Sequence, residues 1–301
     1  MNVGVIGIGK LGSIHLRIYK ETKGIENIYL VDTDASKLVA YQDHPQFRDY
    51  RELPGKVDCV SIATPTIAHF KIAQFFLEHK IPVLVEKPIT QTLAQANKLL
   101  AIAKKNKTLI FVGHVERYNN AYRAVKEFVN SPLFIECHRL SPYPFRSLDV
   151  SVVLDLMIHD LDIILDLVRD KIKRIDAKGV KVLSPTADIA NVRIAFQKGC
   201  VANITASRIS AKKERKIRIF LPQCYISLDY AEQKAEIYQK INNEIKNQLL
   251  PITKEEPLKK EIEDFLNLVR TKTLRFEDAL RAKEALALAL KINSLISRVS
   301  S

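Results

Sequence analysis

The sequence predicts an α/β protein in which an N-terminal Rossmann domain with a doubly wound parallel sheet precedes an α+β domain built on an open, mostly antiparallel sheet. Three observations predict this. Short apolar runs alternate with helical patterns in the first third of the chain, a glycine-rich stretch follows the first run, and the later apolar runs succeed one another without helices between them. Strands separated by helices form parallel sheets, whereas consecutive strands joined by short turns form antiparallel sheets.

The first domain is expected at residues 1–118. Its predicted strands are mostly apolar runs, as expected for strands buried on both faces. They are Val3–Ile8, Ile28–Val31, Cys59–Ala63, Val83–Val85 and Leu109–Val112. Its predicted helices show helical periodicity and are Ser13–Lys20, Ala35–Gln42, Ile67–His79 and Leu93–Lys104.

The second domain is expected at residues 119–301, and its last helices can pack back on the first domain. Its predicted helices are Ala121–Val129, Val150–Val168, Leu258–Arg270 and Phe276–Ser297. Its predicted strands are Phe134–Leu140, Ile172–Val182, Ile189–Phe196, Val201–Ser207, Ile217–Leu221, Ile226–Asp229 and Ala235–Tyr238. Lys198 and Gly199 are expected to form a hairpin turn.

The composition is that of a globular protein, with 47% hydrophobic and 27% charged residues. No apolar stretch is long enough to span a membrane, and no signal-peptide pattern is visible, so a cytoplasmic protein without a membrane partner is expected. The four cysteines form no Cys-x-x-Cys pair and are expected to be reduced thiols. The net charge of +13 raises the possibility of nucleic-acid binding. Because the lysines are spread along the chain, no nucleic-acid partner is expected, and the charge is interpreted as a solvated surface or a field that attracts anionic substrates.

The stretch Gly7-Ile8-Gly9-Lys10-Leu11-Gly12 lies between a predicted strand and a predicted helix. In a dinucleotide-binding turn the first glycine allows the tight turn, the second lets the backbone approach the pyrophosphate, and the third permits close packing of helix and strand. The N–H groups at the helix N-terminus then face the phosphates. This stretch, including Lys10 and Leu11, is therefore predicted to bind the cofactor.

Asp32 ends the second predicted strand, 20 residues after Gly12. An acidic side chain at this place accepts hydrogen bonds from the ribose hydroxyls and repels a 2′-phosphate, which favours NAD over NADP. The alternative is an ordinary strand–helix turn in which Asp32 is a cap.

The predicted strand at Cys59–Ala63 leads into Ala63, Thr64 and Pro65, and His69 follows on the next predicted helix. Because ligands of such sheets bind at the carboxyl ends of the strands, these four residues are predicted to line the dinucleotide cleft. The alternative for Thr64 and Pro65 is a simple helix start, with Thr64 as the cap and Pro65 at the first helical position.

Glu86, Lys87 and Pro88 follow the predicted strand Val83–Val85, again at a carboxyl end, and Glu86 and Lys87 are predicted to bind the cofactor. The Lys87 ammonium would point into the cleft, where it can hydrogen-bond a substrate hydroxyl and stabilise charge that develops on the oxygen. A lysine at a strand end is otherwise a solvated residue.

Asp155 and His159 lie four residues apart in the predicted helix Val150–Val168 and so share one helix face. An imidazole can take a hydroxyl proton as hydride leaves, and a carboxylate can fix its tautomer or contact the substrate. The alternative is a structural pair. A metal site of His159 with Asp162 has too few ligands, so no metal is expected.

Together these motifs resemble the glucose–fructose oxidoreductase, inositol dehydrogenase and MocA family (Gfo/Idh/MocA) over essentially the whole chain. The resemblance rests on the glycine stretch, the Ala-Thr-Pro and Glu-Lys-Pro triplets, Asp155-x-x-x-His159-x-x-Asp162, and a C-terminal pattern at Pro257-Leu258, Phe265 and Glu277-Asp278-Ala279. It implies an NAD-dependent dehydrogenase acting on a CH–OH group. In this family Lys87 would sit beside the nicotinamide and orient the substrate, His159 would act as acid/base, and Asp155 would contact the substrate. A departure from the family is that Leu156, Met157 and Ile158 fill a stretch that often contains glycine.

Two further stretches resemble a subgroup of the family that includes UDP-N-acetylglucosamine 3-dehydrogenases, which belong to lipid A biosynthesis. They run from Gly113 to Asn119 and from Arg139 to Val150. In them Arg117, Tyr118, Arg139 and Arg146 are candidate substrate-binding residues, because forked arginine donors suit a diphosphate. Alternatively, these arginines belong to the surface or to an interface.

The sequence therefore predicts a dehydrogenase of a sugar or nucleotide sugar that assembles as a homodimer or homotetramer. Two alternatives remain open. One is a dehydrogenase of a free sugar or polyol, and the other is a non-catalytic protein of the same fold that senses a sugar or NAD.

Overall fold

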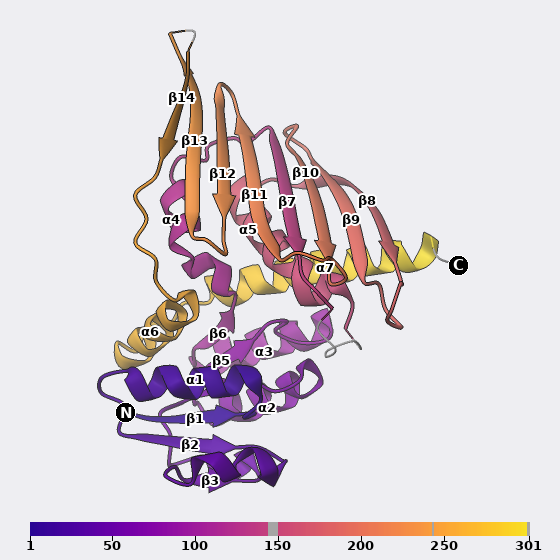
Figure 1. The fold of residues 1–301 in the computed structure, drawn as a ribbon. Helices are drawn as coiled ribbons and strands as arrows, with labels where there is room; N and C mark the ends of the chain where they lie inside the picture. Colours follow the sequence, from indigo (N-terminus) through magenta and orange to yellow (C-terminus); the bar gives the residue numbers. More distant parts are fainter. Residues whose placement is uncertain (144–149, 243, 300–301) are drawn as a thin grey trace. The chain divides into compact units, whose positions relative to one another are not determined.

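The structure is a computed structural model that describes residues 1–143, 150–242 and 244–299. The chain forms two compact units, each built on its own sheet (Figure 1). Unit 1 comprises Met1–His114 and Leu258–Lys283, and unit 2 comprises Val115–Pro257 and the chain from Glu284 onward.

Unit 1 contains a six-stranded sheet with the order β3-β2-β1-β4-β5-β6, in which all pairings are parallel. The strands are β1 (Asn2–Ile6), β2 (Asn27–Val31), β3 (Gln46–Phe47), β4 (Cys59–Ile62), β5 (Val83–Glu86) and β6 (Ile110–Gly113). Every residue of β4, β5 and β6 is buried, which explains why their sequences are mostly apolar. The expected doubly wound parallel sheet is confirmed, with β3 as an addition too short to predict.

The long helices of unit 1 are α1 (Lys10–Glu21), α2 (Thr66–Glu78), α3 (Leu93–Asn106) and most of α6 (Pro257–Arg270). Thr92 and Gln95 form a capping box at the start of α3. On α6, the Phe265 ring lies 5.7 Å from the Phe111 ring of β6.

The helix expected at Ala35–Gln42 is wrong, because this segment forms only two 3₁₀ turns, η1 (Ala35–Lys37) and η2 (Val39–Tyr41). Only Leu38 of this segment is buried, so packing of an apolar face does little to stabilise a longer helix here. A third 3₁₀ turn, η3, follows at Tyr50–Glu52.

Unit 2 contains an eight-stranded sheet with the order β14-β13-β12-β11-β7-β10-β9-β8. Only β7 and β10 pair in parallel, so the expected mostly antiparallel sheet is confirmed. The strands are β7 (Phe134–Leu140), β8 (Ile172–Val180), β9 (Ile189–Phe196), β10 (Val201–Ser207), β11 (Glu214–Leu221), β12 (Cys224–Asp229), β13 (Lys234–Ile241) and β14 (Glu244–Leu249). Gly199 turns between β9 and β10 with a φ of +100°. Strand β14 is not predicted from the sequence. All six of its residues are exposed, so no buried face produces an alternation of apolar and polar residues.

One face of this sheet is buried and the other is not, since burial alternates along β7, β9 and β10. The buried face packs against α4 (Asn120–Lys126), α5 (Ile158–Val168) and the second half of α7 (Glu277–Val299), as can be followed in Figure 1. Val115–Tyr118 forms the 3₁₀ turn η4, and Val153–Met157 forms a π-helical turn, η5.

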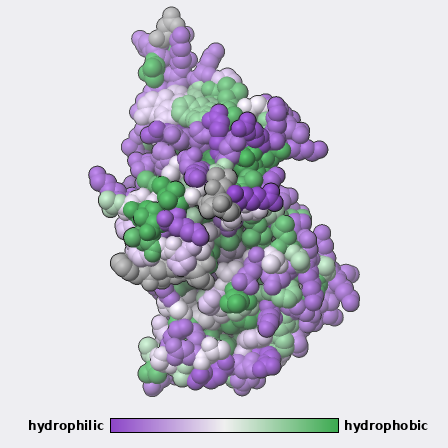
Figure 2. Space-filling view, turned by 90° about the vertical axis from the view of Figure 1, so that its right-hand side faces the viewer, coloured by the Kyte–Doolittle hydropathy of each residue, from purple (hydrophilic) through white to green (hydrophobic). Residues whose placement is uncertain are grey.

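The face of the molecule drawn in Figure 2 shows hydrophilic residues with separate apolar areas between them. None of the helices in the described ranges has the length and apolar content that crossing a membrane requires. All four cysteines are free, and three are buried.

Candidate active site

The turn between β1 and α1 has the geometry of a dinucleotide-binding turn. Gly7 has a φ of +89°, and a Cβ at Gly12 would lie 1.8 Å from the Gly7 carbonyl oxygen, so no larger residue fits at either place. Gly9 is the N-cap of α1, and a Cβ there would meet no described atom within 4 Å. The exposed Lys10 and half-buried Leu11 follow at the first helical positions. The open space at Gly9 and the free N–H groups of α1 fit a phosphate.

Asp32 follows β2 directly and is 7% exposed. Its Oδ2 accepts the backbone N–H of Ile8 at 2.8 Å, and its Oδ1 accepts the backbone N–H of Asp34 at 2.9 Å. The Lys37 ammonium lies 3.5 Å from Oδ2. The carboxylate is thus fixed beside the glycine turn, and its remaining lone pairs can accept ribose hydroxyls.

The loop after β4 carries the next predicted residues. The Ala63 backbone N–H donates to the Ile6 carbonyl at 2.8 Å, so this loop lies beside the glycine turn. Pro65 itself is the N-cap of α2, and no side chain forms a capping hydrogen bond there. The alternative with Thr64 as the cap and Pro65 at the first helical position is therefore wrong. The buried Thr64 Oγ1 has no hydrogen-bond partner among the described residues. A buried hydroxyl of this kind fits a polar ligand in the loop.

His69 is only 1% exposed, and both ring nitrogens lie at backbone carbonyls. Nδ1 is 2.9 Å from the Pro88 oxygen, and Nε2 is 2.8 Å from the Thr64 oxygen. Burial lowers the pKa of His69, although the two carbonyls oppose this shift. A neutral ring donates one hydrogen, so it bonds one carbonyl at a time. The structure therefore shows His69 joining two loops, and its contact with the cofactor stays a prediction.

Glu86 ends β5, and the half-buried Lys87 follows it, joined to Pro88 by a cis peptide bond. The Glu86 carboxylate is 7% exposed. Its Oε1 lies 3.0 Å from His15 Nε2 on α1, and its Oε2 accepts the Lys87 backbone N–H at 3.3 Å. Gly113 of β6 makes room for this carboxylate, because a Cβ there would lie 3.0 Å from Oε2.

In unit 2, Asp155 lies within the π-turn η5, and His159 is the second residue of α5. The single α-helix expected over Val150–Val168 is therefore wrong at its start. Ser151 Oγ accepts the Leu154 N–H at 3.4 Å, as the side chain of an N-cap residue does. The 3.6-residue geometry that places Asp155 and His159 on one face does not hold through η5. Both side chains are partly exposed, and π-turns are frequent at functional sites.

Arg139 is 3% exposed and forms a buried ion network. Its Nε and Nη2 donate to the two oxygens of Asp160 at 2.9 and 2.8 Å, and its Nη1 donates to Glu116 Oε1 at 2.8 Å. Burial opposes the charge on Arg139, but Asp160 and Glu116 outweigh it and raise the guanidinium pKa. The arginine thus fixes α5 and η4 to β7, and its binding of substrate stays a prediction.

Arg117 has a similar arrangement, because its Nε donates to Asp162 Oδ2 at 2.7 Å and its Nη2 donates to Asp162 Oδ1. Tyr118 is half-buried beside it at the end of η4. Arg146, the remaining predicted substrate-binding residue, lies outside the described residues.

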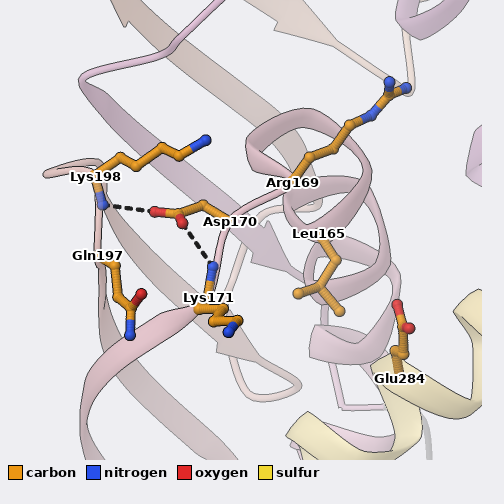
Figure 3. Close-up of a pocket in the computed structure, with 7 residues that line it drawn as sticks. All are labelled: Leu165, Arg169, Asp170, Lys171, Gln197, Lys198 and Glu284. Carbon is orange, nitrogen blue, oxygen red and sulfur yellow. Dashed lines mark hydrogen bonds between the residues drawn. The ribbon is translucent and has the colours of Figure 1, made fainter.

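A hollow of about 480 Å³ lies elsewhere on unit 2, at the end of α5 (Figure 3). Its lining residues are mostly charged and are Leu165, Arg169, Asp170, Lys171, Gln197, Lys198 and Glu284. Asp170 accepts the backbone N–H groups of Lys198 at 2.7 Å and Lys171 at 2.8 Å, so it fixes the hairpin to the helix end. None of the predicted site residues lines this hollow. No metal-binding group of three or more His, Cys, Asp or Glu side chains occurs in the described ranges.

No motif in the sequence indicates the roles of His15, Glu116 and Asp160. A signal exists for His15, a polar residue beside Leu16 and Tyr19 on the buried side of α1. The partners Glu116 and Asp160 meet Arg139 only through folding.

Comparisons with known proteins agree with this arrangement. Residues 1–114 match a family model described as "Oxidoreductase family, NAD-binding Rossmann fold", and residues 132–226 match the GFO/IDH/MocA C-terminal domain. UDP-N-acetylglucosamine 3-dehydrogenase of Acidithiobacillus ferrooxidans is 31% identical over 300 residues, which cover 97% of this chain and 96% of that protein. A myo-inositol 2-dehydrogenase of Thermotoga maritima is 24% identical over 69% of each chain.

Solved structures are similar as well. The structure of the Acidithiobacillus ferrooxidans enzyme aligns with a TM-score of 0.91, covering 99% of this chain and 98% of that one. A levoglucosan dehydrogenase in complex with NADH and levoglucosan aligns with a TM-score of 0.87 over 99% of this chain and 97% of that one. At 16% identity, this second likeness concerns the fold alone.

Proposed function

Because this chain belongs to the Gfo/Idh/MocA family of oxidoreductases, with its NAD-binding Rossmann fold, we propose that it transfers hydride between nicotinamide and a secondary alcohol of a nucleotide sugar of the UDP-N-acetylglucosamine type. One observation carries the choice of substrate. The relative named for UDP-N-acetylglucosamine matches 97% of the chain, whereas the inositol dehydrogenase matches 69% at lower identity.

The cofactor residues of unit 1 fit NAD. Gly7, Gly9 and Gly12 leave space at the N-terminus of α1 for the pyrophosphate, and the Thr64 hydroxyl offers a buried polar group. The Asp32 carboxylate accepts ribose hydroxyls and disfavours a 2′-phosphate. The bound nicotinamide supplies the hydride acceptor, and the chain's own residues supply the rest.

Three side chains are proposed to act on the substrate. Lys87 orients the reacting hydroxyl and stabilises negative charge on its oxygen. His159 takes the hydroxyl proton as the C–H hydride leaves, so that a ketone forms and the proton rests on the imidazole. Asp155 contacts the sugar or orients His159. The support comes from the family motif and from the partial exposure of all three side chains.

Residues 1–118 are proposed as the NAD domain, and residues 119–301 as the substrate and oligomerisation domain of a homodimer or homotetramer. Arg117, Tyr118, Arg139 and Arg146 remain the proposed substrate-binding group. Arg117 and Arg139 differ from the other two, because their guanidinium groups already bond Asp162 and Asp160.

A second candidate function is a dehydrogenase of a free polyol, which the inositol dehydrogenase relatives favour. The two are separated by measuring NADH formation with UDP-N-acetylglucosamine, UDP-glucose, myo-inositol and free hexoses. Activity with inositol and none with any UDP-sugar would overturn the proposed substrate.

Catalysis is tested with Lys87→Ala. We expect turnover to fall by at least about 100-fold, because one charge-stabilising donor is lost, while NADH binding is retained. Ala substitution at Lys80, an exposed residue just after α2, is the matched control. Turnover of Lys87→Ala equal to that of wild type would refute the catalytic assignment.

A further inference from the structure

His15 is a fully buried imidazole on α1, the helix that begins at the glycine turn. Its Nε2 lies 3.0 Å from Glu86 Oε1, and its Nδ1 has no hydrogen-bond partner among the described residues. An ionised carboxylate only accepts hydrogen bonds, so this contact requires a hydrogen on Nε2. The buried ring therefore makes one directed polar contact, and that contact leads to Glu86.

Glu86 passes this contact on to Lys87. One carboxylate oxygen bonds His15, and the other accepts the Lys87 backbone N–H at 3.3 Å. The carboxylate is 7% exposed and occupies space that Gly113 leaves open, because a Cβ there would lie 3.0 Å from Oε2. The Lys87 backbone is thus fixed by a side chain that α1 itself fixes.

The next residue, Pro88, is contacted by a second buried histidine, His69 of α2. His69 reaches the Pro88 carbonyl at 2.9 Å and the Thr64 carbonyl at 2.8 Å. Two buried histidines therefore connect the Glu86–Pro88 segment to the two segments proposed to contact the cofactor, which are α1 and the loop after β4.

We infer that His15 is a positioning residue that fixes the backbone of Lys87 through Glu86, and so couples the phosphate-binding helix to the lysine that orients the substrate. The inference rests on the proposed role of Lys87. His15 itself touches neither cofactor nor substrate in this account, and it acts only through the carboxylate.

The test uses two substitutions that differ in where they place an amide. In His15→Gln the side-chain NH₂ reaches about as far as Nε2, whereas in His15→Asn it reaches only as far as Nδ1. Tyr19→Phe is the control on the same helix, because the Tyr19 hydroxyl is buried and bonds Ser61 Oγ at 2.5 Å instead of Glu86. The readout in the free protein is hydrogen exchange of the Lys87 backbone amide, measured by NMR, with thermal unfolding recorded in parallel.

We expect His15→Asn to speed exchange of the Lys87 amide by about tenfold, the value of one lost hydrogen bond, while His15→Gln and Tyr19→Phe stay close to wild type. Turnover with the UDP-sugar should fall in His15→Asn with the dissociation constant of NADH little changed. Glu86→Gln, which keeps the side-chain volume, should give the same pattern if His15→Asn does not fold.

Unchanged Lys87 exchange in both His15→Asn and Glu86→Gln would overturn the inference. A loss of turnover that His15→Gln does not restore would also contradict it. If exchange responds as expected but wild type oxidises no sugar, the positioning role stands and the proposed function fails. If wild type is active and all variants match it, the proposed function stands and the inference fails.

Discussion

Replacing Arg139 with Met tests whether this residue anchors α5 or binds the substrate. Met keeps much of the length and apolar volume of the side chain but removes its charge and its donors. The substitution leaves the carboxylates of Asp160 and Glu116, which are 2% and 6% exposed, without their main cation. It also removes the contact of the guanidinium with the Tyr230 ring, at 5.5 Å.

The expected cost is large because both anions are buried. Breaking a buried ion pair by removing one partner costs about 3–5 kcal/mol, a large part of the total stability of a typical domain. The matched control is Arg218→Met on the neighbouring strand β11. Its partner Glu136 and Arg218 itself are 29% and 49% exposed, so we expect a cost of at most about 1 kcal/mol.

The stability lost in Arg139→Met should depend on pH, because Asp160 titrates differently in the folded and unfolded chain. Burial already raises the pKa of Asp160 above its ordinary value, and Arg139 opposes that shift. Without Arg139 the pKa rises further. A group whose folded pKa is raised contributes stability below its unfolded pKa and loses it as the pH rises through the folded pKa. The penalty of Arg139→Met should therefore be greatest at neutral pH and smaller at about pH 5.

Urea unfolding at the two pH values measures the penalty, and steady-state kinetics measure KM for the UDP-sugar. A variant within about 1 kcal/mol of wild type, with KM raised and kcat unchanged, would refute the anchoring role and favour substrate binding. Loss of stability with an unchanged KM in the remaining folded enzyme would exclude Arg139 as a diphosphate ligand.

Two further predictions concern unit 1. Gly12→Ala should lower the melting temperature, because its Cβ would lie 1.8 Å from the Gly7 oxygen. Gly9→Ala should fold normally and lose NADH binding, because a Cβ there meets no described atom within 4 Å. Equal effects of the two substitutions in thermal unfolding and in NADH titration would contradict this account of the turn. Burial lowers the pKa of His69, so the unfolded chain binds a proton that the folded chain resists, and wild-type stability should fall as the pH drops below the ordinary value of 6.5. His69→Gln should flatten that part of the curve, and an unchanged slope in acid-range urea titrations would show that another group causes it.

The parts of the fold that the sequence predicts correctly depend on local patterns. Fully buried strands such as β4 and β5 are mostly apolar runs, and the Gly7–Gly12 spacing is complete within six residues. The failures have local physical causes too. The segment Ala35–Gln42 buries only Leu38 and forms 3₁₀ turns instead of a helix, and β14 has no buried face that would show as a pattern in the sequence.

The site was harder to predict, because its partners are far apart in the chain. His15 and Glu86 are separated by 71 residues, and Arg139 lies 23 residues from Glu116. No periodicity connects such pairs, and only the sheet order brings them together. The sequence therefore indicated the residue types of the site but not which of them bond one another.

The arginines show most clearly what residue type leaves open. A guanidinium offers the same forked donors to a diphosphate and to a carboxylate, so Arg117 and Arg139 fit both roles in sequence. In the structure α5 carries Asp160, Asp162 and Asp166, each of them buried and each within reach of a cation from η4, β7 or α4. A helix with three buried carboxylates needs three partners, because an unpaired buried charge costs several kcal/mol. Arg117 and Arg139, two of the predicted substrate ligands, are the partners of Asp162 and Asp160. The arginines predicted to bind a diphosphate therefore also fix the helix that bears His159.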